Sequence, residues 1–187
     1  MRTVVIATLF ATALAAADLD VPGVVEVAGK PYSNAVVWIE TSVRVPRDQK
    51  QPPVLDQRNL RFSPQVLAVQ VGTRVKFPNS DRVFHNVFSY KDGKRFDLGF
   101  YPTGAVKFEV FDKAGVSRLF CNIHPQMAAY VVAVDSPFFA VSDENGRFVL
   151  GGVPAGSHTY RAWRSGGPEL RGTFVAAPGA ELEVRWP

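Results

Sequence analysis

The sequence predicts an all-β protein made of two β-sandwiches. Apolar and polar residues alternate in several short segments, which is the pattern of half-buried strands. Glycine and proline turn signals separate these segments, and no window of a dozen residues carries a helical stripe of apolar side chains. Short strands at regular spacing are typical of β-sandwiches.

Residues 1–17 are predicted to be a cleaved signal peptide. Arg2 supplies a short positive start, residues 3–14 are apolar or small, and alanines precede Asp18. The apolar run of about 12 residues is too short for a bilayer, which takes about 20. We therefore expect an exported protein with no membrane span, located in a bacterial periplasm.

The strand candidates follow one another along the rest of the chain. A first β segment at 21–40 has a turn at 29–31, and its two strands need partners to bury a core. Residues 69–77 alternate on either side of a turn at 72–73. The further candidates are 108–111, 116–120, 129–134, 148–150, 159–163, 173–175 and 182–186.

Composition suggests where the domains divide. Residues 44–59 are polar and contain three prolines, so we predict a linker there. Residues 60–134 are then one sandwich. The short segment 18–43 cannot bury a core alone, and we expect it to join 135–187 in a discontinuous second sandwich.

The chain is mildly basic, with a formal net charge of +4 and a pI near 9.4. Its lysines and arginines are scattered rather than clustered, and an exported protein meets little nucleic acid. We interpret the excess charge as a solvated face that steers an acidic partner protein, and we expect no nucleic-acid binding.

The motif with the clearest chemistry is Cys121, His124 and Met127 at C-x-x-H-x-x-M spacing. Cys121 is the only cysteine. In an oxidising compartment a lone cysteine is an intermolecular bridge, a free thiol or a metal ligand. A thiolate, an imidazole and a thioether together suit copper, and the alternative is a core cysteine beside unrelated neighbours.

His85 is the predicted second imidazole. It lies among apolar residues at 83–88, where a histidine by itself is more often part of the core than a ligand. With the C-x-x-H-x-x-M motif also present, ligation is favoured, because a blue-copper centre needs two imidazoles, one thiolate and a weak axial thioether.

The segment 64–79, the pair His85 and Asn86, and the C-x-x-H-x-x-M loop resemble the cupredoxins over about residues 60–134. The short loop is most like that of amicyanin and is shorter than those of plastocyanins and azurins. The resemblance implies a Greek-key β-sandwich that holds one type 1 copper. The implied ligands are His85, Cys121, His124 and Met127.

The same resemblance implies roles for other residues near the metal. Asn86 would hydrogen-bond across to the ligand loop, and His124 would expose its ring edge at an apolar electron-transfer patch. The implied patch members are Phe84, Pro125 and Gln126. Two features depart from the family: Phe84 replaces a proline common in amicyanins, and residues 90–106 match no expected strand.

The two ends of the chain resemble another family. Residues 25–40 look like the opening hairpin of a carboxypeptidase-regulatory-like, transthyretin-type β-sandwich, and residues 142–160 look like its middle. A cupredoxin would then be inserted in this second sandwich. The whole arrangement is similar to bacterial proteins labelled methylamine-utilisation or plastocyanin-like, a label from which we infer no methylamine chemistry.

These features predict a one-electron carrier that works between redox proteins. The alternatives are a copper carrier or storage protein and a cell-envelope binding module with a vestigial copper site. An enzyme is not expected, because we find no Ser/His/Asp set and no paired carboxylates.

Overall fold

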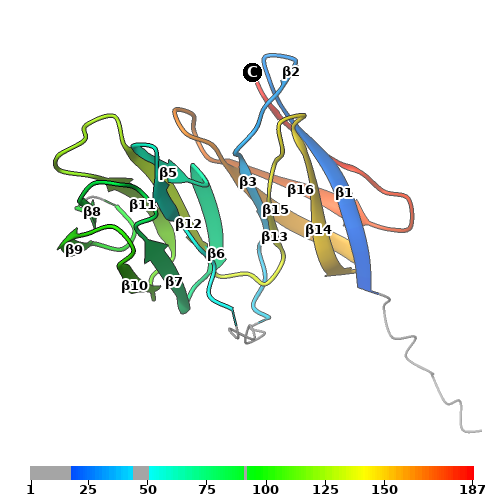
Figure 1. Cartoon of the computed structure of the whole chain (residues 1–187). Coiled ribbons are helices and arrows are strands. Elements are labelled where there is room, and N and C mark those ends of the chain that lie inside the picture. Colours follow the sequence, from blue (N-terminus) through cyan, green and yellow to red (C-terminus); the bar gives the residue numbers. More distant parts are fainter. Residues whose placement is uncertain (1–17, 44–50, 91) are drawn as a thin grey trace, which may run out of the picture.

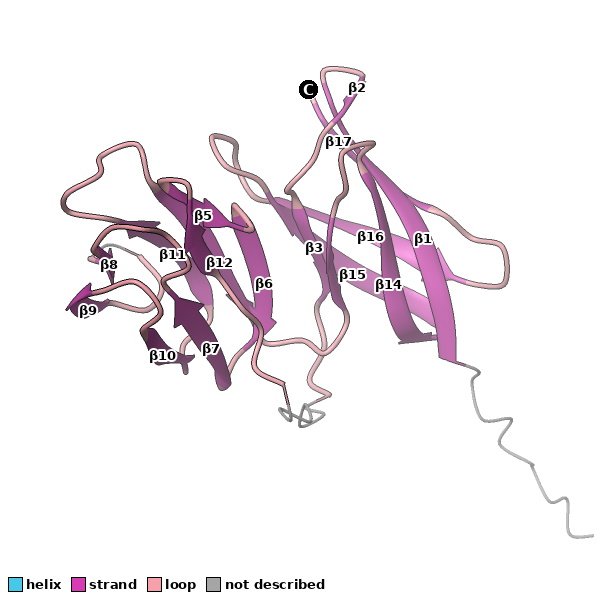
Figure 2. Cartoon of the chain, in the orientation of Figure 1, coloured by secondary structure: helices cyan, strands magenta, loops and turns pink. Residues whose placement is uncertain are grey.

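The computed structural model describes residues 18–43, 51–90 and 92–187, and these residues form an all-β protein (Figures 1 and 2). Two sandwiches lie side by side, one built from the middle of the chain and the other from its two ends. No helix in the described ranges is long and apolar enough to cross a membrane.

The flanking sandwich, which we define as residues 18–43 and 135–187, consists of two four-stranded sheets. The first contains β1 (Asp18–Val27), β2 (Lys30–Pro31), β14 (Arg147–Pro154) and β17 (Leu182–Trp186). The second contains β13 (Phe139–Val141), β3 (Val36–Ile39), β15 (Gly156–Trp163) and β16 (Leu170–Ala176). Buried side chains of both sheets meet in one core, which includes Val25, Ile39 and Trp186.

The inserted sandwich, residues 51–134, has a five-stranded sheet facing a two-stranded one. The larger sheet has the order β6 (Val66–Gln70), β12 (Ala128–Val134), β11 (Gly115–Phe120), β8 (His85–Ser89) and β9 (Phe96–Tyr101). The smaller sheet pairs β7 (Thr73–Pro78) with β10 (Val106–Phe111). A hairpin of β4 (Asp56–Arg58) and β5 (Arg61–Ser63) completes this unit. Phe77, Phe111 and Leu119 lie at the centre of its core.

A third apolar cluster joins the two sandwiches. Val36 of β3 packs there with Val66 of β6 and Val132 of β12, and all three are at most 4% exposed. Tyr130 and Trp163 meet across the same contact with their ring centroids 5.1 Å apart, and the Ser165 hydroxyl donates to the Tyr130 hydroxyl. The sheet of β3 and the sheet of β12 are therefore each covered on both faces.

This double covering explains the hydrophobic pattern of β12. Val131 points into the core of the inserted sandwich, whereas its neighbour Val132 points into the contact between the sandwiches. A strand buried on both faces has an unbroken apolar sequence instead of an alternating one. The run 129–134 is such a sequence.

The structure differs from the sequence prediction in three places. The segment 25–40 is not one long hairpin, because β1 and β3 belong to different sheets and β1 turns back only onto the short β2. The stretch 90–106, for which no strand was expected, contains β9, whose mixed exposure and Gly99 hide the strand pattern. The predicted linker 44–59 includes β4 and the fully buried Leu55, which packs into the inserted core.

Two sequence predictions concern segments that the structure leaves out. The predicted signal peptide, residues 1–17, lies outside the described residues, as does the stretch 44–50 of the predicted linker.

We predict that Val132→Ala lowers the free energy of unfolding by about 2 kcal/mol, because it removes two buried methyl groups and leaves a void between the sandwiches. Urea unfolding measures the change. Val175→Ala is the matched control, since Val175 is 62% exposed, and it should change stability by less than about 0.5 kcal/mol. Equal losses in the two variants would contradict the packing described for Val132.

Candidate metal centre

Three of the candidate ligands lie on the short connection between β11 and β12. β11 ends at Phe120 and β12 begins at Ala128, so Cys121 and Met127 occupy the two ends of the loop and His124 its middle. The Met127 amide donates to the His124 carbonyl at 2.9 Å, which holds the loop in a tight turn. Cys121 and Met127 are 4% and 1% exposed, and both belong to the inserted core.

The fourth candidate comes from a neighbouring strand. His85 opens β8, is completely buried, and lies opposite Tyr101 of β9 in the antiparallel register. β8 also pairs with β11, the strand that leads to Cys121. Two adjacent strands of one sheet therefore bring His85 to the ligand loop.

Three donor atoms converge at one point. The Nδ1 atoms of His85 and His124 are 3.0 Å apart, and the Cys121 Sγ atom is 3.8 Å from the first and 3.6 Å from the second. In the described part of the chain this trio is the one group of histidine, cysteine and acidic side chains placed to hold a metal ion. With Met127 buried beside them, the four side chains form a donor cluster of the kind found in type 1 copper sites.

The separations fit a single metal ion. Bonds of roughly 2.0 Å to nitrogen and 2.3 Å to sulfur would reach all three donor atoms from one point, because no two of these atoms are more than 3.8 Å apart. His85, His124 and Cys121 would therefore hold one ion together, with two neutral imidazoles and a thiolate as its donors.

Asn86 links the two halves of the centre. Its side-chain Oδ1 accepts a hydrogen bond of 2.8 Å from the amide of Asn122, the residue after Cys121. Its side-chain amide lies 3.5 Å from Asp97 Oδ1 on β9. Because Asn86 is 1% exposed, this contact is shielded from water and restrains the ligand loop against the strand that carries His85.

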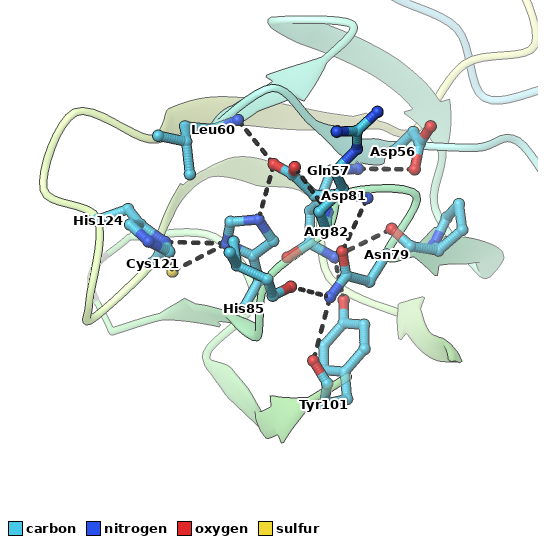
Figure 3. A network of polar contacts seen from close by, with 12 residues as sticks. Asp56, Gln57, Leu60, Asn79, Asp81, Arg82, His85, Tyr101, Cys121 and His124 are labelled. Atoms are coloured by element: carbon cyan, nitrogen blue, oxygen red, sulfur yellow. Dashed lines mark hydrogen bonds and ion pairs between the residues drawn. The ribbon is translucent and has the colours of Figure 1, made fainter. Parts of the chain in front are cut away.

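Asp81 is a functional residue that the sequence analysis missed. Its Oδ2 atom lies 3.1 Å from His85 Nε2, on the side of the ring away from Cys121 (Figure 3). A proton on Nε2 that is shared with Asp81 leaves Nδ1 free as a lone-pair donor to a metal. The spacing of four residues between Asp81 and His85 was the available signal, but only a folded loop turns the carboxylate toward the ring.

Asp81 is itself held by the backbone. Its Oδ2 accepts a hydrogen bond of 2.7 Å from the Leu60 amide, and its Oδ1 accepts one of 2.8 Å from the Arg82 amide. The bond from Leu60 is the main cause that lowers the pKa of the Asp81 carboxyl to about 2, and the bonds from Arg82 and His85 add to it. Asp81 therefore stays ionised wherever the protein is folded at moderate pH.

The Leu60 amide reaches Asp81 because of the turn between β4 and β5. Asn59 and Leu60 both have positive φ, at 54° and 56°, which is the geometry of a type I′ hairpin. This backbone is unfavourable for leucine and needs support from surrounding contacts. The bond to Asp81 supplies one, so the hairpin and the ligand-bearing strand stabilise each other.

A second set of bonds holds the loop before His85. The Asn79 side-chain amide donates to the carbonyls of Val83 and Tyr101, and Asn79 Oδ1 accepts from the Asp81 amide (Figure 3). The side-chain amide of Gln57, in β4, donates to the Tyr101 hydroxyl. Asn79, Gln57 and Tyr101 are all buried, so the chain of contacts from β4 to His85 is protected from water.

The predicted patch residues are exposed and neighbour candidate ligands in the chain. Phe84 is 57% exposed, and Pro125 and Gln126 are exposed on the ligand loop, where Ile123 is also 49% exposed. His124 is only partly buried, unlike His85. His124 is therefore the most exposed of the four candidate ligands.

We predict that the free energy of unfolding of the metal-free protein falls as the pH drops from about 4 to about 2. Because the folded-state pKa of Asp81 is depressed, its stabilisation is complete above the ordinary carboxyl pKa and disappears as the pH falls through about 2. Asp81→Asn should reduce this fall by about 1–2 kcal/mol in chemical denaturation at each pH. Glu144→Gln, at an exposed turn, is the charge-matched control. The prediction would be refuted if the free energy of unfolding of Asp81→Asn fell with pH as steeply as that of the wild type.

A scan against protein-family models finds no match for the chain, and a search of curated proteins finds none either. Solved structures do resemble part of it. A purple cupredoxin from Nitrosopumilus maritimus is 30% identical, covers 43% of this chain and 96% of its own, and has a TM-score of 0.39.

Two further structures show the same partial likeness. An oxidised mutant of amicyanin is 22% identical over 44% of this chain and 81% of its own, with a TM-score of 0.41. A Cu-containing nitrite reductase from Thermus scotoductus SA-01 is 21% identical over 52% of this chain and 25% of its own, with a TM-score of 0.43. About half of this all-β chain is thus similar to cupredoxins.

Proposed function

We propose that the protein is a type 1 copper protein that carries one electron at a time between redox partners. The observation that carries the proposal is the convergence of His85 Nδ1, His124 Nδ1 and Cys121 Sγ within 3.8 Å of one another. Residues 60–134 would be its cupredoxin domain, with Met127 as the weak axial ligand.

Copper is favoured over zinc by the donor set. Structural zinc sites use four strong ligands drawn from cysteine, histidine and carboxylates. Here the fourth donor is the thioether of Met127, a soft and weak ligand that suits copper, and no carboxylate belongs to the trio in the described part of the chain.

Electron transfer is favoured by the way the ligands are held. His85 is fixed by Asp81 on one side and by its strand on the other, and the loop is tied to that strand through Asn86. Donors that are rigid and buried before the metal binds suit a centre whose geometry changes little between Cu(I) and Cu(II). His124 is partly exposed and is followed by the exposed Pro125, so an electron would have a short path from the centre to the surface.

Copper delivery is a weaker candidate. A delivery protein exchanges its metal readily, whereas His85, Cys121 and Met127 are each at most 4% exposed, so an incoming chelator has little access. Slow loss of copper to an excess of chelator supports the electron carrier. Loss within seconds would favour delivery.

The proposal extends to the setting of the protein. We infer an exported, periplasmic protein that meets acidic redox proteins, supported by the signal-like start and the net charge of +4. We also propose a carboxypeptidase-regulatory-like identity for the flanking sandwich, supported by its two packed four-stranded sheets and the turn motifs in its sequence. We assign the protein no enzymatic reaction of its own.

We predict that the Cu(II)-loaded wild type shows a strong thiolate-to-copper charge-transfer band in the visible spectrum and that Cys121→Ala lacks it. The loss follows because Cys121 supplies the only thiolate. Bound copper, measured by elemental analysis, separates a lost ligand from a lost metal. A band that survives in Cys121→Ala would refute the ligand assignment.

We further predict that Met127→Leu keeps the colour but has a higher reduction potential than the wild type. Leucine preserves the buried volume, while removal of the axial thioether favours Cu(I). Voltammetry measures the potential. An unchanged or lower value would show that Met127 does not face the metal.

A further inference from the structure

A groove lies between the β4–β5 hairpin and the ligand loop, with a volume of about 720 Å³. One wall carries Arg58 and Arg61 of the hairpin, and the other carries Gln126 and Ala128, on either side of the candidate ligand Met127. None of its lining residues is acidic. The groove therefore places two cationic side chains opposite the end of the ligand loop that contains Met127.

The two arginines of the hairpin lie opposite each other, where their positive charges repel. Arg58 and Arg61 are direct cross-strand partners of the hairpin, and like charges in that arrangement repel one another. Both residues are exposed, and no described carboxylate pairs with either of them. By contrast Arg161, Arg171 and Arg185 of the flanking sandwich all form ion pairs. Among the described residues no ion pair offsets the repulsion at the hairpin.

A second hollow continues the cationic surface around the hairpin. Arg58 lines it together with Arg82 and Asp81. The Asp81 carboxylate is occupied by the Leu60 and Arg82 amides and by His85, and its side chain is only 12% exposed. Among the described residues Asp81 forms an ion pair with His85 and none with Arg58 or Arg82, so no carboxylate contacts these guanidinium groups directly.

Exposed apolar side chains occur on the same segments. Leu60, at the tip of the hairpin, is 37% exposed, and Val83 and Phe84, which follow Arg82 and precede His85, are 42% and 57% exposed. Ile123 of the ligand loop is 49% exposed. Protein–protein interfaces combine apolar side chains with a polar rim.

We propose that the β4–β5 hairpin and the ligand loop form a docking surface for an acidic segment of a redox partner protein. Carboxylates of the partner enter the groove and pair with Arg58 and Arg61, whose forked guanidinium groups match carboxylate geometry. The partner's apolar surface then covers Leu60, Phe84 and Ile123 and approaches His124. This docking surface names the kind of partner that the proposed electron carrier would meet, and it rests on that proposed function.

The first experiment uses a hexaglutamate peptide as the probe and the metal-free, ¹⁵N-labelled full chain as the target, so its result does not depend on copper. At low ionic strength we expect shifts of the amide signals of residues 58–65 and 126–128. The double variant Arg58→Glu with Arg61→Glu should weaken binding about tenfold or more. Raising the salt to about 0.5 M should abolish the difference, since exposed charges are then screened.

A double variant of the flanking sandwich controls for net charge. Lys30→Glu with Arg147→Glu makes the same change in charge at exposed residues remote from the groove. The proposal would be overturned if this control bound the peptide as weakly as the hairpin variant does. So would shifts spread evenly over all basic residues, or shifts of equal size with free glutamate or inorganic phosphate, which indicate a small-anion site.

The second experiment separates docking from the copper proposal. In the proteins loaded with copper and reduced to Cu(I), we measure the rate of oxidation to Cu(II) by ferricyanide, an anionic one-electron oxidant, and by a cationic cobalt(III) phenanthroline complex. The hairpin variant should slow the first reaction about tenfold at low salt and not slow the second, and its Cu(II) form should show the visible band. An unchanged ferricyanide rate in a variant whose Cu(II) form is coloured overturns the docking surface alone, whereas a wild type whose Cu(II)-loaded form is colourless overturns the proposed function.

Discussion

The burial of both faces of β12 is the constraint on which most of this structure depends. One face closes the core that contains Cys121 and Met127, and the other packs against the flanking sandwich. The ligand loop enters this strand directly, so it begins from a fixed point. Removing either apolar contact would expose that face of β12 to water, and because both faces belong to one strand, the candidate metal centre and the flanking sandwich depend on each other.

The second anchor of the centre is polar. His85 is too buried to be oriented by water, and its orientation instead follows a chain of contacts through Asp81 to the Leu60 amide in the β4–β5 hairpin. A buried polar network holds its members well only when its groups are satisfied. Most groups here are paired, the exception in the described network being Gln57 Oε1, which has no partner. The hairpin is thus part of the centre although it supplies no ligand.

The same hairpin contains two features that are unfavourable for its own stability. Its turn holds Leu60 in an unfavourable backbone conformation, and its strands set Arg58 against Arg61. Neither feature helps the hairpin fold by itself. Both become understandable when the hairpin is regarded as the support of His85 on its inner side and as a surface for an acidic partner on its outer side.

The sequence by itself determined the β class, most strand positions and the candidate donors, because alternation, turn residues and the C-x-x-H-x-x-M spacing are local signals. The resemblance also implied that Asn86 hydrogen-bonds across to the ligand loop, and Asn86 Oδ1 does accept the Asn122 amide of that loop. The sequence could not reveal β9 or the sheet to which each strand belongs, since strand pairing is set by packing between distant residues.

Only the tertiary structure decided the rest of the centre. Asp81, Gln57 and Leu60 carry no motif, and they act together because two loops far apart in sequence fold against each other. The predicted linker became part of the core for the same reason, with Leu55 buried at its end. The type of each candidate donor follows from its residue type. The distances between the donors, and the groups that orient them, arise only when the chain is packed.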